Sequence, residues 1–234
     1  MNKKIIKLVS CLFCTNCILV GCTSNSKYPS NEEMVKHIEE KYEEDFEYYG
    51  PAGGTIMAES KEIFCSSPSY PNYLAWVYYE PKTDTYKDDV IPMKFNQKTN
   101  QKMDKIAEKA LSGNKYARVF YEGGGLSKPE WNSNTTFEEY YTSLKARISF
   151  MVIVEADSEY SNLNEIVENI KSAILDSGMY IKFIRIKFIS PENFHYKQVV
   201  DKKEYAAIKG ENCIQFIRLE MEDLDTFSEL RISK

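Results

Sequence analysis

Residues 147–155 read Arg-Ile-Ser-Phe-Met-Val-Ile-Val-Glu, an almost unbroken apolar run. Such a run is typical of a β-strand that is covered on both faces. An amphipathic helix follows, and a second apolar strand covers residues 180–189. The helix shows apolar residues at helical spacing: Leu163, Ile166, Val167, Ile170, Ala173 and Ile174. The order strand, helix, strand predicts a βαβ unit at 147–189 with two parallel strands.

Two segments in this half of the chain resemble each other. Residues 181–188 read Ile-Lys-Phe-Ile-Arg-Ile-Lys-Phe, and residues 214–221 read Ile-Gln-Phe-Ile-Arg-Leu-Glu-Met. The shared pattern predicts neighbouring strands of one sheet, with the second one antiparallel and following the βαβ unit. In both segments an adjacent Phe and Ile interrupt the alternation, which predicts a bulge or a local exchange of faces.

The remaining periodicity predicts an α+β fold, a mixed sheet with helices. Asn31 is the expected N-cap of the first helix, and Asn162 with Glu165 has the spacing of a capping box. One domain over residues 31–234 is expected, with a sub-boundary near 122–135 as the alternative because that stretch is rich in Gly, Pro and Asn. The further strands are expected at 55–58, 62–65, 73–80 and 116–121, and the further helices at 31–46, 101–112, 137–144 and 201–208.

The composition excludes several classes of protein. The chain has 234 residues, of which 43% are hydrophobic, so it can bury a core and is not disordered as a whole. It carries 30 Lys+Arg and 35 Asp+Glu, a net charge of −5. This acidic balance argues against a nucleic-acid partner, because phosphate backbones require a clustered cationic surface.

The N-terminus has the three parts of a secretory signal. Lys3, Lys4 and Lys7 precede an apolar run over residues 8–20, which ends at Gly21 and turns polar after it. The run is shorter than the roughly 20 apolar residues that a membrane-spanning helix needs. Residues 1–21 are therefore expected to be a signal peptide.

Leu19-Val20-Gly21-Cys22 resembles the lipobox of bacterial lipoproteins. The resemblance implies that Cys22 receives a diacylglyceryl group and becomes the mature N-terminus, with residues 22–30 as a lipidated tether. It also implies a place on the extracytoplasmic face of the cell membrane. Loss of residues 1–21 removes three Lys and no acid, which changes the net charge from −5 to −8. Two acyl chains anchor a protein stably, whereas this charge disfavours further docking on anionic lipids.

The six Cys do not indicate an iron–sulfur cluster. Cys11, Cys14 and Cys17 lie in the segment that is expected to be removed, and the spacing to Cys22 is one residue longer than in ferredoxins. Cys65 and Cys213 remain, and they are either partners in one disulfide or buried free thiols. No metal and no other cofactor is expected, because the mature chain has no H-E-x-x-H or C-x-x-C spacing.

Aromatic residues supply the candidate binding site. Tyr70, Tyr73 and Trp76 crowd one predicted hairpin, and Trp131 lies in the Pro- and Asn-containing loop. Such rings can stack on sugars or peptides, although with 17 Tyr in the chain structural packing is the alternative.

No nucleophile motif such as G-x-S-x-G or S-x-x-K accompanies the aromatic residues. We therefore expect a membrane-anchored surface lipoprotein that is a non-catalytic binding or interaction module for a cell-envelope protein or glycan. The alternatives are an extracytoplasmic hydrolase of cell-wall material and a transporter-associated solute-binding protein.

Overall fold

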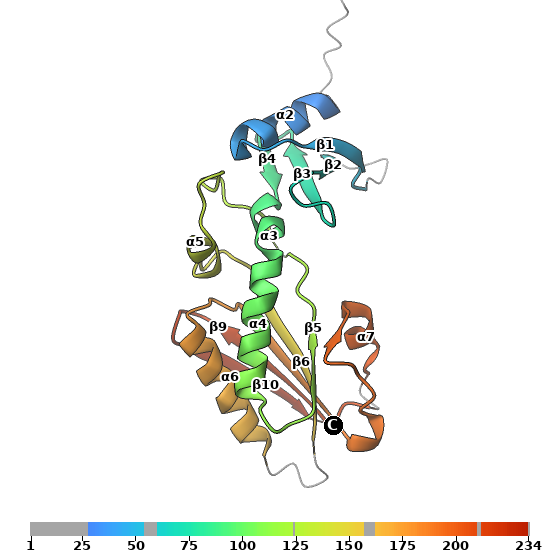
Figure 1. The fold of residues 1–234 in the computed structure, drawn as a ribbon, viewed down its shortest axis with the longest axis vertical. Helices are drawn as coiled ribbons and strands as arrows, with labels where there is room; N and C mark the ends of the chain where they lie inside the picture. The colour runs from blue at the N-terminus through green and yellow to red at the C-terminus, as the bar shows by residue number, and fades with distance from the viewer. Residues whose placement is uncertain (1–27, 54–59, 124, 157–161, 210–211, 234) are drawn as a thin grey trace, which may run out of the picture.

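The computed structural model describes residues 28–53, 60–123, 125–156, 162–209 and 212–233. Two β-sheets lie at opposite ends of the long axis, with helices between and beside them (Figure 1). The helices are α2 (Asn31–Tyr42), α3 (Val90–Lys94), α4 (Asn96–Ala110), α5 (Phe137–Tyr141), α6 (Leu163–Ser177), α7 (Lys202–Ala207) and the 3-10 turn η1 (Pro191–Asn193). The strands are β1 (Glu47–Pro51), β2 (Lys61–Ser66), β3 (Leu74–Glu80), β4 (Thr85–Asp88), β5 (Tyr116–Val119), β6 (Ser149–Glu155), β7 (Phe183–Ile189), β8 (Val199–Val200), β9 (Gln215–Met221) and β10 (Phe227–Ser233). The α+β prediction is confirmed.

The first sheet has the order β1-β2-β3-β4, and every neighbouring pair is antiparallel. Its buried residues alternate along β2 and β3 and pack against Met34, Ile38 and Tyr42 of α2. Ser30, and not Asn31, is the N-cap of α2, where it forms a capping box with Glu33. The predicted strand at 55–58 lies outside the described residues.

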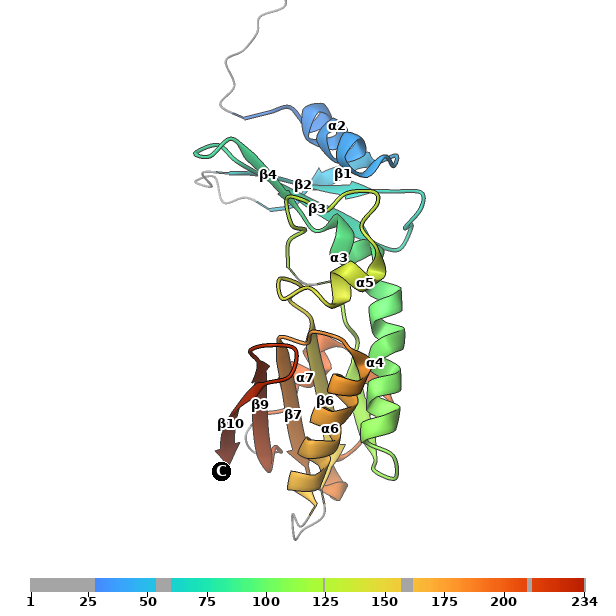
Figure 2. The ribbon, with the colours of Figure 1, turned by 90° about the vertical axis from the view of Figure 1, so that its left-hand side faces the viewer.

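The second sheet is mixed, with the order β10-β9-β7-β6-β5-β8. The parallel pair β6 and β7 is joined through α6, which confirms the βαβ unit, and β9 follows as the predicted antiparallel neighbour of β7. Helices α4 and α6 lie side by side over one face of this sheet (Figure 2). Their apolar sides form one continuous core with the sheet and with the first half of the chain.

The predicted bulge in β7 and β9 is wrong. Both pairings of β7 continue in register from Phe183 onward. Phe183 keeps its place on the face opposite α6 because two cationic groups flank its ring, Arg218 at 5.0 Å and Arg185 at 5.7 Å from the centroid. An aromatic residue on a polar face therefore explains the break in the pattern.

Two further predictions need correction. Residues 122–135 do not divide the chain, because β5 before them pairs with β6 after them. The loop instead returns to the first sheet, where Ser127 N donates to Asp88 O at 2.6 Å and Ser127 Oγ accepts from Ile91 N at 3.1 Å. Asn162 is the N-cap of α6 but its side chain makes no capping hydrogen bond, so the predicted capping box is absent there.

Candidate functional site

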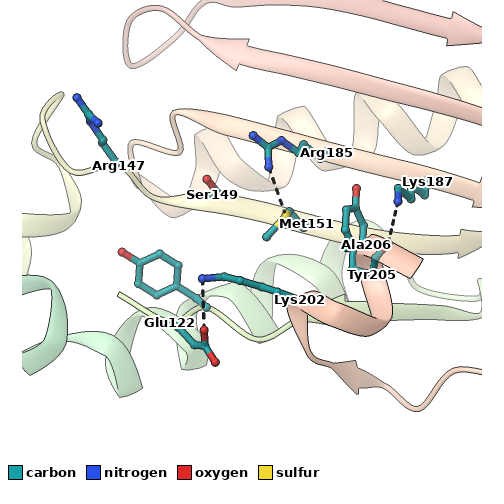
Figure 3. A pocket seen from close by; sticks show the side chains of 10 residues that line it. Glu122, Arg147, Ser149, Met151, Arg185, Lys187, Lys202, Tyr205 and Ala206 are labelled. Atoms are coloured by element: carbon teal, nitrogen blue, oxygen red, sulfur yellow. Dashed lines mark hydrogen bonds and ion pairs between the residues drawn. The ribbon is translucent and has the colours of Figure 1, made fainter. Parts of the chain in front are cut away.

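The candidate site lies on the face of the second sheet that is opposite α4 and α6. Helix α7 covers only part of this face, where Tyr205 and Ile208 pack with Val119 and Ile153. Beside α7 the face is hollowed by a pocket of about 450 Å³ (Figure 3). The lining residues are Tyr121, Glu122, Arg147, Ser149, Met151, Arg185, Lys187, Lys202, Tyr205 and Ala206. Four separate parts of the chain thus form its wall.

The pleat of β6 and β7 determines which side chains reach the pocket. Residues that pair across parallel strands point to the same face, and Met151 pairs with Arg185. The neighbouring positions of the two strands point to the other face. Val152 and Ile184, for example, are fully buried against the helices there. Alternation along β7 therefore places Arg185 and Lys187 on the pocket side.

Lys187 fastens α7 to the sheet. Its Nζ donates to Tyr205 O and Ile208 O, both at 2.8 Å, and lies 4.2 Å from the centroid of the Tyr205 ring. These carbonyls belong to the last turn of α7, where a cation is favourable. Burial lowers the pKa of Lys187. Lys187 is thus a structural cation, and two of its three N–H donors are already engaged.

The two arginines of the pocket have fewer polar partners than its two lysines. Lys202 is paired with Glu122 at 3.4 Å, whereas no carboxylate in the described part of the chain forms an ion pair with Arg147 or Arg185. Arg147 extends from the segment before β6, and Arg185 extends from β7 (Figure 3). The polar neighbour of Arg185 is the sulfur of Met151, at 3.8 Å. These guanidinium groups are available for an anion, to which they can donate in bidentate geometry.

A buried hydroxyl accompanies the arginines. Tyr205 is 7% exposed, and its Oη has no hydrogen-bond partner among the described residues. Burial raises the pKa of Tyr205, and the nearby charge of Arg185 opposes that rise, so the phenol is neutral and can donate. A buried polar group without a partner costs about 1–3 kcal/mol. Tyr205 and Arg185 both line the pocket, so the hydroxyl is a candidate donor to an anion held there.

The cationic surface continues beyond this pocket. Arg147 also borders a second pocket of about 540 Å³, on whose lining Lys145 and Lys182 lie. Lys182 is 2.6 Å from Glu220, and Arg218 is 3.5 Å from the same carboxylate, so this part of the face is partly neutralised. Lys145, Arg147 and Arg185 are the cations of this surface that form no ion pair within the described residues.

The predicted aromatic patch is not formed as one surface. Trp131 is 5% exposed and packs edge-on against Tyr140 at 5.6 Å, so it does not share an exposed surface with the tyrosines. It lines a separate pocket with Asn132 and Leu144, and a ligand role for it stays a prediction. Trp76 is partly buried on the first sheet, and its Nε1 donates to Glu62 at 3.1 Å. Tyr70 and Tyr73 are partly buried and pack against the core. A ligand role for these three residues stays a prediction.

The disulfide alternative is wrong. Cys65 and Cys213 are both buried thiols that form no disulfide, and they belong to different hydrophobic clusters. Burial raises the pKa of Cys65 to about 12, which keeps it a neutral thiol. Cys22 lies outside the described residues.

Titratable side chains form no metal centre within the described ranges, where no group of three His, Cys, Asp or Glu converges. His37 stacks on Tyr86 at 4.0 Å, and burial lowers the pKa of His37. His195 is exposed in the connection after β7. Neither histidine lines the cationic pocket.

Sequence reasoning missed the cationic pocket. Its signal was the placing of Arg185 and Lys187 at alternate positions of an otherwise apolar strand. That pattern is also typical of an ordinary solvent-facing strand. Only the position of α7, which comes later in the chain, makes it one wall of a pocket.

Comparison with known proteins was made by sequence and by structure. No family model matches the chain, and no curated protein matches it. The crystal structure of a DUF5037 family protein from Ruminococcus gnavus ATCC 29149 has a TM-score of 0.40 and 12% sequence identity, and the match covers 84% of this chain and 93% of that chain. At this level of similarity the match carries no information about what this chain binds.

Proposed function

We propose that this protein is a membrane-anchored surface lipoprotein, lipidated at Cys22, whose folded domain binds an anionic ligand without catalysis. The ligand group is a carboxylate or a phosphate, such as those carried by cell-envelope glycans. The observation that carries the binding proposal is the pair Arg147 and Arg185, which line the pocket and have no carboxylate partner among the described residues. Arg185 is partly buried whereas Arg147 is exposed. A partly buried cation binds an anion more strongly than the same cation in water does, so most of the affinity is expected from Arg185.

The pocket chemistry favours binding over hydrolysis. Ser149 is the aliphatic hydroxyl of the lining, and no histidine lines the pocket beside it as a general base. The carboxylate of Glu122 is held by Lys202 at 3.4 Å, and Lys187 is held by two carbonyls. General acid–base catalysis would require Glu122 or Lys187 to leave its present partners.

Support for the anchor comes from the sequence Leu19-Val20-Gly21-Cys22. None of the helices in the described ranges has the length and hydropathy that a membrane crossing requires. Cys22→Ala should release the protein from the membrane fraction after cell lysis and carbonate extraction. Retention of this variant in the membrane would contradict lipidation at Cys22. It would not bear on the ligand site, which is tested separately.

The ligand site is tested by calorimetric titration of the full chain with glucuronate and with glycerol phosphate. Arg185→Gln should raise the Kd about 10- to 100-fold, since a hydrogen bond to a charged group contributes about 1.5–3 kcal/mol. Lys109→Gln is the matched control. Lys109 lies on α4, away from the pocket, where it forms an exposed ion pair with Asp176 of α6, so the substitution removes the same charge elsewhere. Equal binding by wild type and Arg185→Gln would refute the site.

A further inference from the structure

Strand β10 ends the second sheet with an unpaired edge. It pairs with β9 over all seven of its residues, and no other described segment pairs with its outer side. An edge of this length offers a row of free backbone donors and acceptors to another strand. Short strands, prolines or bulges, which protect many edges, are absent from β10.

The hydrogen-bond alternation identifies which backbone groups are free. Glu222 N donates to Thr226 O at 3.0 Å across the hairpin, while Met221 N donates in the opposite direction, to Lys182 O at 3.2 Å. In an antiparallel ladder the bonded and non-bonded pairs alternate. Residues 228, 230 and 232 therefore turn their backbone groups toward β9, and residues 227, 229, 231 and 233 turn theirs to the free edge.

The side chains at this edge are self-complementary. Two copies of one strand that pair antiparallel are related by a two-fold axis, and the free backbone groups allow axes at residues 229, 230 or 231. An axis at Glu229 opposes two carboxylates, and an axis at Arg231 opposes two guanidinium groups. Within each chain Glu229 already forms ion pairs with Arg231 and, at 3.1 Å, with Lys171 of α6. An axis at Leu230 extends this row by placing Glu229 of each copy opposite Arg231 of the other, which is the favourable arrangement.

Leu230 supplies an apolar contact at the same axis. It is 54% exposed at the middle of β10, on the open face where its β9 partner is Arg218. With the axis at this residue, the two Leu230 side chains meet in a non-hydrogen-bonded pair, in which the Cα atoms approach to about 4.5 Å. The exposed Leu230 thus becomes covered by the same register that pairs the charges.

We propose that two copies of this chain associate through antiparallel pairing of β10, with the two-fold axis at Leu230. The two six-stranded sheets then form one continuous sheet. An axis perpendicular to the sheet keeps both open faces on the same side, so the two Arg185 pockets face the same way. The proposal does not depend on the ligand at those pockets.

Disulfide trapping in the full chain tests the register. Leu230→Cys should give a covalent dimer under mild oxidation, because directly opposed residues have a Cα separation that a disulfide bridges. Glu229→Cys and Arg231→Cys are the matched controls. Each is opposite the other position in the partner copy, so neither should cross-link to itself, and the wild type reports any background from its native cysteines. Preferential cross-linking of Glu229→Cys or Arg231→Cys would overturn the register.

Charge reversal with rescue tests the association by sedimentation equilibrium. Arg231→Glu should weaken the dimer about tenfold or more, because it opposes like charges twice, and the added Glu229→Arg should restore it. The thermal unfolding midpoint of each variant shows whether the fold is intact. A wild-type chain that is monomeric at about 100 µM would overturn the proposal. So would a dimer that Arg231→Glu does not weaken and Leu230→Cys does not trap.

Discussion

Asp89 at the junction of β4 and α3 should make the protein less stable as the pH rises. Its Oδ1 accepts from Trp76 N at 2.7 Å, but the carboxyl lies in a desolvated place next to Asp88. Burial raises the pKa of Asp89 from 3.8 to about 7. The folded state therefore keeps its proton up to about pH 7 whereas the unfolded state loses it near pH 4, so stability falls between these values.

The size of the effect follows from the pKa difference. About three pKa units at about 1.4 kcal/mol each give a ceiling of roughly 4 kcal/mol above pH 7, and partial exposure reduces this to about 2–4 kcal/mol. Asp89→Asn keeps an acceptor for Trp76 N and removes the ionisation. The variant should be more stable than wild type by that amount at pH 8, and nearly equal to it at pH 4.

Urea denaturation followed by tryptophan fluorescence at the two pH values measures the difference. Asp88→Asn is the matched control, because Asp88 accepts from Lys41 Nζ at 2.8 Å and from Tyr42 Oη at 2.6 Å. Loss of that buried ion pair should destabilise the protein at pH 8, the opposite direction. A stabilisation by Asp89→Asn that is the same at pH 4 and pH 8 would refute a raised pKa.

Two other substitutions test contacts around the second sheet. Asn100→Leu should lower the free energy of unfolding, measured by urea denaturation, by about 3–5 kcal/mol. The reason is that the Asn100 amide forms hydrogen bonds with Arg118 and with both backbone groups of Tyr121 inside the core. A loss below about 1 kcal/mol would contradict this. Lys187→Met should speed amide hydrogen exchange in α7, since the last carbonyls of that helix lose their cation. Unchanged exchange there would show that Lys187 does not hold the helix.

The predictable part of the fold is the part with long, regular patterns. The run at 149–155, the helix at 163–177 and the strand at 183–189 each bury a full face, so their periodicity is strong. β1 and β4 were not predicted because they are short, and the residues of β1 are mostly exposed. β10 was not predicted either, since its alternating polar and charged residues have a weak apolar signal.

The candidate site could not be predicted because it depends on which face of a sheet is left open. The alternation in β7 shows two faces, but it does not show that α4 and α6 take one of them and α7 only part of the other. Trp131 was misplaced for a related reason. A loop rich in Asn and Pro is usually exposed, yet this one turns its indole into the core beside Tyr140.

The net charge of −5 concealed a cationic surface because the charges are segregated. Glu32, Glu33, Glu39 and Glu40 belong to α2, at the opposite end of the long axis from the second sheet (Figure 1). Cys22 lies six residues before Tyr28, a reach of at most about 20 Å. A lipid at Cys22 would therefore hold the acidic end near the membrane. For the anion binding that we propose, the local charge at Arg147 and Arg185 matters more than the average over the chain.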